Sequence, residues 1–239
     1  MENPILTIDE REAINSGRWF GSLSPSLRHD ILRCAYVKRF RDGDLICARG
    51  DPPEDWIACA KGAVRVSSTS ISGKQVTLTY VEPGIWFGDV SIFDGDRRTH
   101  DAYAHGECTI LCVAKADFKK ILAAHVELYE AMLRLHARRI RQLFGLVEDL
   151  NTLPLRARLA KQLIHLVRSY GVPSLSNASE MRISLHLAQE ELAQLLGASR
   201  QRVNQELKSM EREETLRIEP GGLIIRNRDA LMRIVEADQ

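Results

Sequence analysis

The stretch from Gln189 to Lys208, QEELAQLLGASRQRVNQELK, constrains the fold of this chain more than any other part of the sequence. Gly197 can adopt the positive φ that a tight turn between two helices requires, and the Ser199 hydroxyl can cap the free N–H groups of the helix that follows. Apolar residues recur at helical spacing on both sides of this turn, at Leu192, Leu195, Leu196, Val203 and Leu207. The pattern therefore predicts two short helices packed as a helix-turn-helix.

The second helix of this motif leaves a polar face exposed near its start. Its side chains can form hydrogen bonds with base edges and phosphates; they are Ser199, Arg200, Gln201, Arg202, Asn204 and Gln205. The alternative is an amphipathic helical hairpin whose outer face is merely polar. That alternative does not explain a Gly turn and a Ser cap placed directly before side chains of this kind. We therefore expect the second helix to enter the major groove of double-stranded DNA.

The segments around the motif predict a winged helix. Met181–Leu185 reads as a short strand that precedes it. After it, Leu216–Glu219 and Leu223–Arg226 flank a Pro-Gly-Gly turn, which is typical of a β-hairpin. One residue does not fit the pattern: the first helix of the motif begins after Ala188, which is a poor N-cap.

The region from about Arg18 to Lys115 is rich in β-strand signals. Short runs alternate apolar and polar residues, as in Gln75–Tyr80 and Thr109–Val113, and glycines separate them. Short strands at this spacing with glycine turns predict a β-sandwich or barrel. The predicted fold class is therefore α+β, with a β-roll of the double-stranded β-helix (jelly-roll) type followed by helices.

From about Asp117 to Leu150 glycine nearly disappears and helix-forming residues dominate, which predicts a long helix. Six residues in it follow alternating steps of three and four, as in a coiled-coil seam: Leu133, His136, Ile140, Leu143, Val147 and Leu150. The stripe could pack against the chain's own β domain, but a symmetric dimer seam fits better, because palindromic DNA is matched by a two-fold protein. Pro154 ends the helix. We expect a tail over 1–17, a sensing domain over 18–120, a dimerisation helix over 121–152 and the DNA-binding domain over 153–239.

Composition narrows the possible partners and locations. The chain has 33 basic and 32 acidic residues, so DNA binding must come from a local surface. It has no apolar run long enough to span a membrane and no signal-peptide pattern, so we expect a cytoplasmic protein without a membrane partner. The five cysteines are scattered and indicate neither a disulfide framework nor a metal site; they are Cys34, Cys47, Cys59, Cys108 and Cys112.

Two motifs together resemble the CRP/FNR superfamily of bacterial transcription regulators. Trp86–Ala104, WFGDVSIFDGDRRTHDAYA, is similar to the family's phosphate-binding cassette, and Leu196–Lys208 is similar to its recognition helix. The resemblance implies a β-roll of the cyclic-nucleotide-binding type, a homodimer, an effector-responsive regulator and RNA polymerase as a partner. It also implies an effector site that contains Gly88, Asp89, Arg98 and Thr99.

The chemistry of these four residues suits a phosphate and a sugar. A turn at Gly88 exposes backbone N–H groups to an oxyanion, and Arg98 can clamp a phosphate while Thr99 donates a hydroxyl. Asp89 can accept a hydrogen bond from a sugar hydroxyl, although the family usually has Glu there. An ordinary β-turn with a surface Asp–Arg pair is the alternative.

The base end of the site departs from the cyclic-AMP receptor. Aligned through the paired arginines Arg138 and Arg139, Leu143 and Phe144 stand where the resemblance implies hydroxyl residues. The effector therefore stays open among cyclic AMP, cyclic GMP and a cyclic dinucleotide.

Other functions remain as alternatives. They are a regulator of this fold without a nucleotide, a nucleotide-binding regulatory subunit and a cupin-like enzyme. His100 and His105 lack the close ligand spacing of a cupin metal site. We therefore expect neither catalytic residues nor a metal, and the cysteines give no iron–sulfur cluster.

Overall fold

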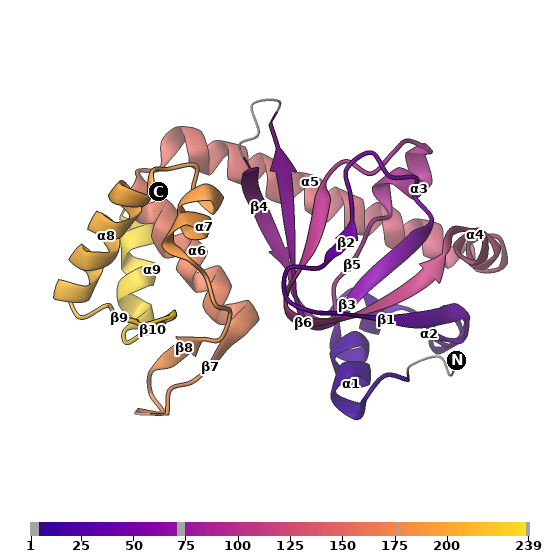
Figure 1. The fold of residues 1–239 in the computed structure, drawn as a ribbon, viewed down its shortest axis with the longest axis horizontal. Coiled ribbons are helices and arrows are strands. Elements are labelled where there is room, and N and C mark those ends of the chain that lie inside the picture. The colour runs from indigo at the N-terminus through magenta and orange to yellow at the C-terminus, as the bar shows by residue number, and fades with distance from the viewer. Residues whose placement is uncertain (1–4, 71–74, 176, 238–239) are drawn as a thin grey trace. The chain divides into compact units, whose positions relative to one another are not determined.

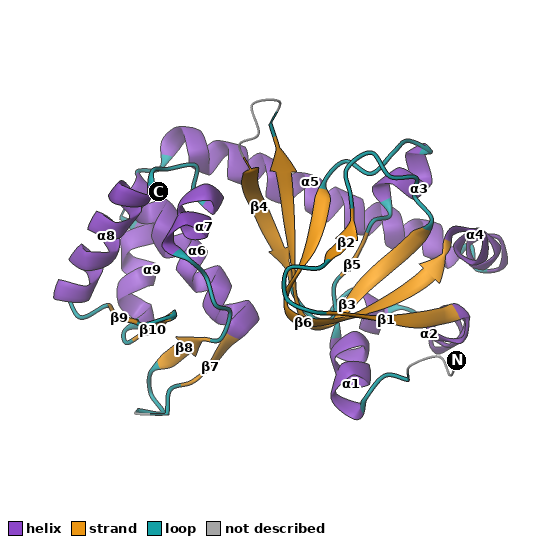
Figure 2. Ribbon diagram, in the orientation of Figure 1, coloured by secondary structure: helices purple, strands orange, loops and turns teal. Residues whose placement is uncertain are grey.

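The computed structural model describes residues 5–70, 75–175 and 177–237. The chain divides into two compact units, Met1–Ile140 and Arg141–Gln239. Figure 1 labels their elements and Figure 2 distinguishes helices from strands.

The first unit is an antiparallel β-roll with helices before and after it. Its strands are β1 (Ala35–Phe40), β2 (Leu45–Cys47), β3 (Asp55–Thr69), β4 (Gln75–Val81), β5 (Trp86–Phe87) and β6 (Asp101–Ala114). They pair in the order β1-β6-β3-β4, with β2 also on β6 and β5 on β3. The expectation of a β-roll in this part of the chain is confirmed.

Helices cover the outer side of this sheet. They are α1 (Ile8–Ser16), α2 (Pro25–Cys34), α3 (Val90–Asp94), α4 (Lys115–Ala124) and the start of α5 (Glu127–Thr152), with a 3-10 turn at Phe20–Ser22. A cluster of aromatic side chains packs between these helices and the sheet. The ring centroids of Trp56 and Trp86 are 4.1 Å apart, and Phe20 stacks on Trp86. A second apolar cluster fills the inside of the roll around Ile57, Val64 and Ile110.

The N-terminal residues are not a tail where the structure describes them, and that expectation was wrong. Residues 8–16 form α1, which begins with a capping box between Thr7 and Glu10. Ile14 is fully buried in the core, and Glu10 forms an ion pair with Arg39 and accepts a hydrogen bond from Thr109. The sequence gives only a weak helical pattern here, so tertiary contacts determine this helix.

The predicted long helix is present as α5, but it begins later in the chain than expected. α4 ends at Ala124 and α5 starts at Glu127, so the expected helix over 121–152 is two helices. Five members of the expected seam are exposed, with exposures of 70% for Leu133, 51% for Ile140, 61% for Leu143, 56% for Val147 and 45% for Leu150. His136 is different, because its Nε2 lies 3.2 Å from the Asp89 carboxylate within the first unit.

The second unit is the expected winged helix. It contains α6 (Leu155–Tyr170), β7 (Gly171–Pro173), β8 (Met181–Ile183), α7 (Gln189–Leu195), α8 (Arg200–Arg212), β9 (Leu216–Glu219), β10 (Gly222–Ile225) and α9 (Arg228–Glu236). The four strands pair in the order β7-β8-β10-β9. Helix α9, which packs against α6, was not predicted from the sequence.

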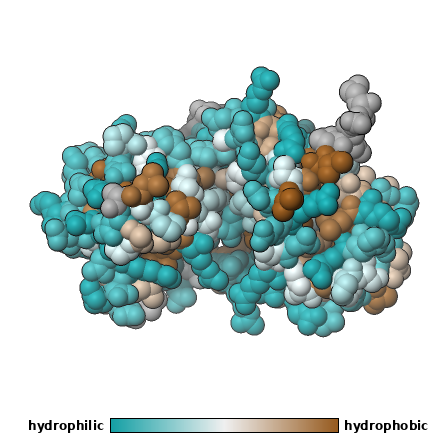
Figure 3. Space-filling model, turned by 90° about the horizontal axis from the view of Figure 1, so that it is seen from below, coloured by the Kyte–Doolittle hydropathy of each residue, from teal (hydrophilic) through white to brown (hydrophobic). Residues whose placement is uncertain are grey.

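The weak cap at Ala188 has a local solution. The Glu191 carboxylate accepts a hydrogen bond from the Ala188 N–H at 3.0 Å. This is one of the two hydrogen bonds of a capping box, and it uses the backbone of the N-cap residue rather than its side chain. Among the described residues, no helix is long and apolar enough to cross a membrane. On the face drawn in Figure 3, apolar side chains form small separate groups within a mostly hydrophilic surface.

Candidate effector cavity and recognition helix

Arg98 is held in place by the turn at Gly88. Its Nη1 donates to the Gly88 carbonyl at 2.8 Å, and its Nη2 donates to the Asp55 carbonyl. Gly88 has a φ of +80°, and a Cβ at this position would collide with the Arg98 guanidinium. Glycine is therefore required here for two reasons, its backbone conformation and the close approach of the arginine.

The charge of Arg98 is buried without an anionic partner. The residue is 8% exposed, and among the described residues its guanidinium forms no ion pair with a carboxylate. Burying a cation costs several kcal/mol unless an anion or good hydrogen bonds compensate it. Two carbonyl oxygens satisfy some of its donors, but they leave the positive charge available to a bound anion.

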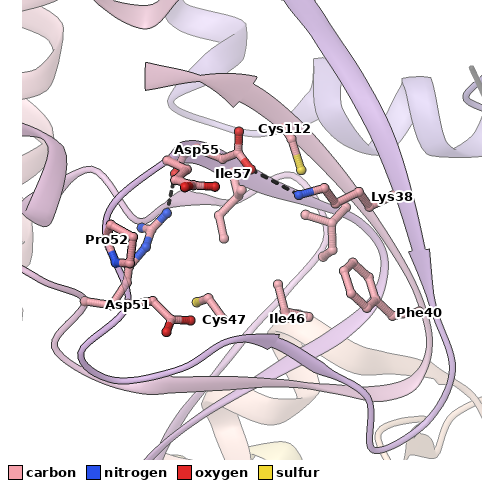
Figure 4. A pocket seen from close by; sticks show the side chains of 12 residues that line it. Lys38, Phe40, Ile46, Cys47, Asp51, Pro52, Asp55, Ile57 and Cys112 are labelled. Atoms are coloured by element: carbon pink, nitrogen blue, oxygen red, sulfur yellow. Dashed lines mark hydrogen bonds and ion pairs between the residues drawn. The ribbon is translucent and has the colours of Figure 1, made fainter. Parts of the chain in front are cut away.

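Arg98 lines a cavity of about 250 Å³ inside the β-roll (Figure 4). Lys38 and Asp55 form an ion pair at 3.1 Å on its wall, and the Tyr36 hydroxyl donates to the same carboxylate at 2.7 Å. Lys38, Arg98 and Asp55 thus form one connected network around the cavity. The lining residues are Lys38, Phe40, Ile46, Cys47, Asp51, Pro52, Glu54, Asp55, Ile57, Arg98, Ile110 and Cys112.

The network changes the pKa values of two groups. Burial and the hydrogen bond to Asp55 raise the pKa of Tyr36 to about 12, so its hydroxyl stays protonated and keeps donating. Burial alone would lower the pKa of Lys38, but the hydrogen bond to Asp55 and the electrostatic attraction of Cys112, Asp55 and Tyr36 together outweigh burial, and the pKa is raised. Lys38 therefore remains a cation at neutral pH.

The two thiols of the cavity wall are poor nucleophiles and poor metal ligands. Burial raises the pKa of Cys47, and it raises the pKa of Cys112 to about 12. The thiolate is the reactive form, so both side chains stay inert thiols. In the part of the chain that the structure describes, no three His, Cys, Asp or Glu side chains form a metal-ligating group.

Asp89 does not point where the sequence analysis expected it. It is fully buried and absent from the cavity wall. Its carboxylate accepts from Arg139 Nη1 at 2.8 and 3.1 Å and lies 3.2 Å from His136 Nε2. Arg139 also donates to the Trp86 carbonyl. The expected sugar acceptor therefore ties the cassette to α5, because buried carboxylates need charged partners.

The remaining expected effector residues do not line this cavity within the first unit, or belong to the second unit. Thr99 is exposed and its hydroxyl lies 2.8 Å from His100 Nδ1. Leu143 and Phe144 belong to the second unit and are 61% and 71% exposed. Lys38 and Asp55 were not predicted as site residues, and His136 and Arg139 were predicted in other roles, since only the register of the strands and the path of α5 bring these side chains to this region.

The recognition helix is built as expected. Gly197 has a φ of +59°, and the Ser199 hydroxyl accepts from the Arg202 N–H at 3.4 Å. Apolar residues of α8 are buried against the unit, namely Val203, Leu207 and Met210. The outward face is exposed at Ser199, Arg200, Gln201, Arg202 and Gln205.

Asn204 is the exception on this face. It is half-buried, and its side-chain oxygen accepts a long hydrogen bond of 3.5 Å from Gln189 of α7. Part of its hydrogen-bonding capacity is therefore used within the motif.

Known protein families match both the β-roll and the helix-turn-helix of this chain. Residues 37–125 match the cyclic nucleotide-binding domain family, and residues 157–234 match the Crp-like helix-turn-helix domain family. A CRP-like cAMP-activated global transcriptional regulator of Mycobacterium tuberculosis is 30% identical over 214 residues, which cover 90% of this chain and 94% of that protein. The chain belongs to the family of CRP-like transcription regulators.

Other relatives agree with this membership. The global nitrogen regulator of Synechococcus elongatus is 28% identical over 82% of this chain and 87% of its own length. The structure of FixK2 from Bradyrhizobium japonicum superposes with a TM-score of 0.73 at 20% identity, covering 84% of this chain and 96% of that one, and supports the fold. This CRP-like protein is thus a transcription regulator rather than an enzyme, with a cyclic-nucleotide-binding-type domain and a DNA-binding helix-turn-helix.

Proposed function

We propose that this CRP-like regulator binds an anionic effector through Arg98 and couples its presence to DNA binding. The observation that carries the proposal is the buried guanidinium of Arg98, which has carbonyl partners but no carboxylate. A phosphate would supply the missing charge and accept two parallel hydrogen bonds. The cyclic nucleotide-binding match makes a cyclic nucleotide the first candidate.

The base end of such a nucleotide would be recognised weakly. Leu143 and Phe144 offer no hydrogen-bonding groups. A site that hydrogen-bonds its ligand discriminates much better than an apolar one, since a wrong ligand leaves buried polar atoms unpaired. Adenine and guanine nucleotides should therefore bind with affinities that differ by about tenfold or less.

A second candidate has one observation in its favour. Asp89 faces α5 and is absent from the cavity wall, so the cavity presents Arg98 and Lys38 without the expected sugar acceptor. A small organic anion without a ribose would fit this arrangement too.

A thermal-shift experiment separates the two candidates. The purified protein is heated with cyclic AMP, cyclic GMP, cyclic di-GMP, inorganic phosphate and a set of small carboxylates. A ligand at 100 times its Kd stabilises the folded state by about 2.7 kcal/mol, which raises the Tm of a chain of this size by about 5 °C or more. A shift with cyclic nucleotides alone supports the first candidate, a shift with small anions alone supports the second, and no shift contradicts both.

We further propose that two copies dimerise through α5 and bind a palindromic site. The stripe Leu133, Ile140, Leu143, Val147 and Leu150 is exposed, and such a row of apolar side chains is stabilised by burial against a second copy. A two-fold dimer would place two α8 helices in half-sites roughly 34–36 Å apart. The residues proposed to contact the DNA are Ser199, Arg200, Gln201, Arg202, Asn204 and Gln205.

RNA polymerase is the further partner that we propose for this regulator, and the cytoplasm, where bacterial DNA lies, is the location. Co-sedimentation of the dimer with RNA polymerase on promoter DNA tests the contact. Equal recovery with and without the regulator would contradict it.

A further inference from the structure

A second pocket lies in the first unit where α1, α2 and β1 meet, and we call it the α1–α2 pocket. Its volume is about 570 Å³, which is within the range of pockets that hold small organic molecules. Its lining shares no residue with the lining of the cavity around Arg98. The lining residues are Ile5, Leu6, Arg11, Ile14, Asn15, His29, Leu32, Arg33, Ala35, Tyr36, Val37 and Leu111.

The floor of the α1–α2 pocket is apolar. Ile14 and Leu111 are buried members of the core cluster between the helices and the sheet, and Leu6 and Leu32 pack against the same cluster while partly buried. Ile5 also lines the pocket, although its side chain is 72% exposed. Covering apolar surface of this kind is favourable, so each methylene that an alkyl chain buries here should raise its affinity about fourfold.

The exposed edge of the same pocket is basic. Arg11 of α1 and Arg33 of α2 line it together with Asn15 and His29, and the described lining contains no Asp or Glu. Arg33 has an exposed partner in Asp30 at 3.3 Å, whereas Arg11 forms no ion pair with any residue that the structure describes. A carboxylate at this edge would therefore meet two guanidinium groups, which bind carboxylates through paired hydrogen bonds.

We infer that the α1–α2 pocket binds a medium-chain fatty acid, with the alkyl chain on the apolar floor and the carboxylate beside Arg11 and Arg33. A small anion would leave the floor in contact with water, and an uncharged hydrocarbon would leave both guanidinium groups without an anion. An amphipathic anion matches the two parts of the lining at once. This site is separate from the proposed effector cavity and does not depend on it.

The test uses decanoate as the probe, titrated by calorimetry into the full-length protein below its micellar concentration. Octanoate and 1-decanol are titrated in the same way. Decanoate should bind about 15-fold more tightly than octanoate, because it buries two more methylenes. Equal affinities of the two acids would show that the alkyl chain is not buried and would overturn the inference.

A charge variant tests the basic edge without disturbing the core. The double variant Arg11→Gln, Arg33→Gln should weaken decanoate about 3- to 10-fold, because exposed ion pairs contribute modestly, and should change the affinity of decanol less than about twofold. The matched control is Arg18→Gln, Arg41→Gln, which removes the same charge from exposed positions outside the pocket. Equal losses of decanoate affinity in the two double variants would reflect general attraction to positive charge and would contradict the site.

Two single variants locate the ligand. Leu32→Trp should fill the pocket and weaken decanoate and decanol alike by about tenfold or more, with the Tm reporting that the fold is retained. Arg98→Gln shows whether the anion binds inside the β-roll instead. Unchanged decanoate affinity in Arg98→Gln supports the α1–α2 pocket, and a loss there refutes it. If the wild type does not bind decanoate, the inference fails while the proposed effector function stands.

Discussion

Replacing Arg98 by Gln should remove effector binding while leaving the fold almost as stable. The guanidinium donates to the carbonyls of Gly88 and Asp55. Each hydrogen bond from a charged donor contributes about 1.5–3 kcal/mol, and burying the unpaired charge costs several kcal/mol in the opposite direction. The two contributions nearly cancel, so we expect the free energy of unfolding to change by about 1 kcal/mol or less. By contrast, removing one partner of a conventional buried ion pair lowers the free energy of unfolding by about 3–5 kcal/mol.

The effect on an anionic ligand has no such compensation. A lost charge-assisted bond of about 1.5–3 kcal/mol corresponds to a loss of affinity of roughly 10- to 100-fold. Urea unfolding measures the first quantity, and calorimetry with cyclic AMP and with inorganic phosphate measures the second. Arg97→Gln is the control, because the guanidinium of this exposed neighbour donates to the Gly50 carbonyl at 2.7 Å and, among the described residues, does not line the cavity. A stability loss of about 3 kcal/mol with intact affinity would show that Arg98 is a structural tie, and the argument from its unpaired charge would fail.

Three further outcomes test other parts of the protein. Arg200→Ala should weaken binding to the specific DNA site by about 1–3 kcal/mol and leave random DNA nearly unaffected, as gel-shift titrations would show; equal losses on both would make Arg200 a phosphate contact. The double variant Ile140→Asp, Val147→Asp should sediment as a monomer and lose its palindrome, since burying unpaired charge in the seam is costly; a wild type that sediments as a monomer at micromolar concentration would contradict the dimer. Glu10→Gln should destabilise the fold by about 2–3 kcal/mol at pH 7. Burial by itself would raise the pKa of Glu10. Hydrogen bonds from Arg39, Thr109 and the Thr7 N–H outweigh burial and lower this pKa from 4.5 to about 2. A lowered folded-state pKa means that this contribution is complete above about pH 4.5 and is lost as the pH falls through about 2, so a difference that stays constant down to pH 2 would refute it. Glu12→Gln, on the exposed side of the same helix, is the control.

The sequence was most informative where local chemistry determines local structure. Gly197 and Ser199 take the roles in the helix-turn-helix that their residue types favour, a left-handed turn and a hydroxyl cap. The hairpin around the Pro-Gly-Gly turn forms within one residue of its expected bounds. These features depend on residues that are close together in the chain, and they can therefore be predicted from the sequence.

The same reasoning fails where contacts join distant segments. α1 has little amphipathic pattern, and its position depends on Glu10 meeting Thr109, 99 residues away. The cavity depends on the Lys38–Asp55 pair and on Arg98 reaching the Asp55 carbonyl across 43 residues. No spacing rule relates such positions, because the register of the β-strands creates the contacts.

His136 shows how one periodic pattern can combine two structural roles. Its spacing placed it in the apolar stripe of α5, yet the structure turns its ring to Asp89, since a buried carboxylate attracts a side chain that can carry charge. His136 thus has a contact within its own chain, and its place in the dimer seam stays a proposal. Ile140, four residues later and thus on nearly the same side of the helix, is 51% exposed. The contact with the cassette and the proposed dimer seam are therefore one helical turn apart on α5. A ligand that altered the bonds to Asp89 would therefore act one helical turn from the proposed seam, and this placement would give an effector signal a short path along α5.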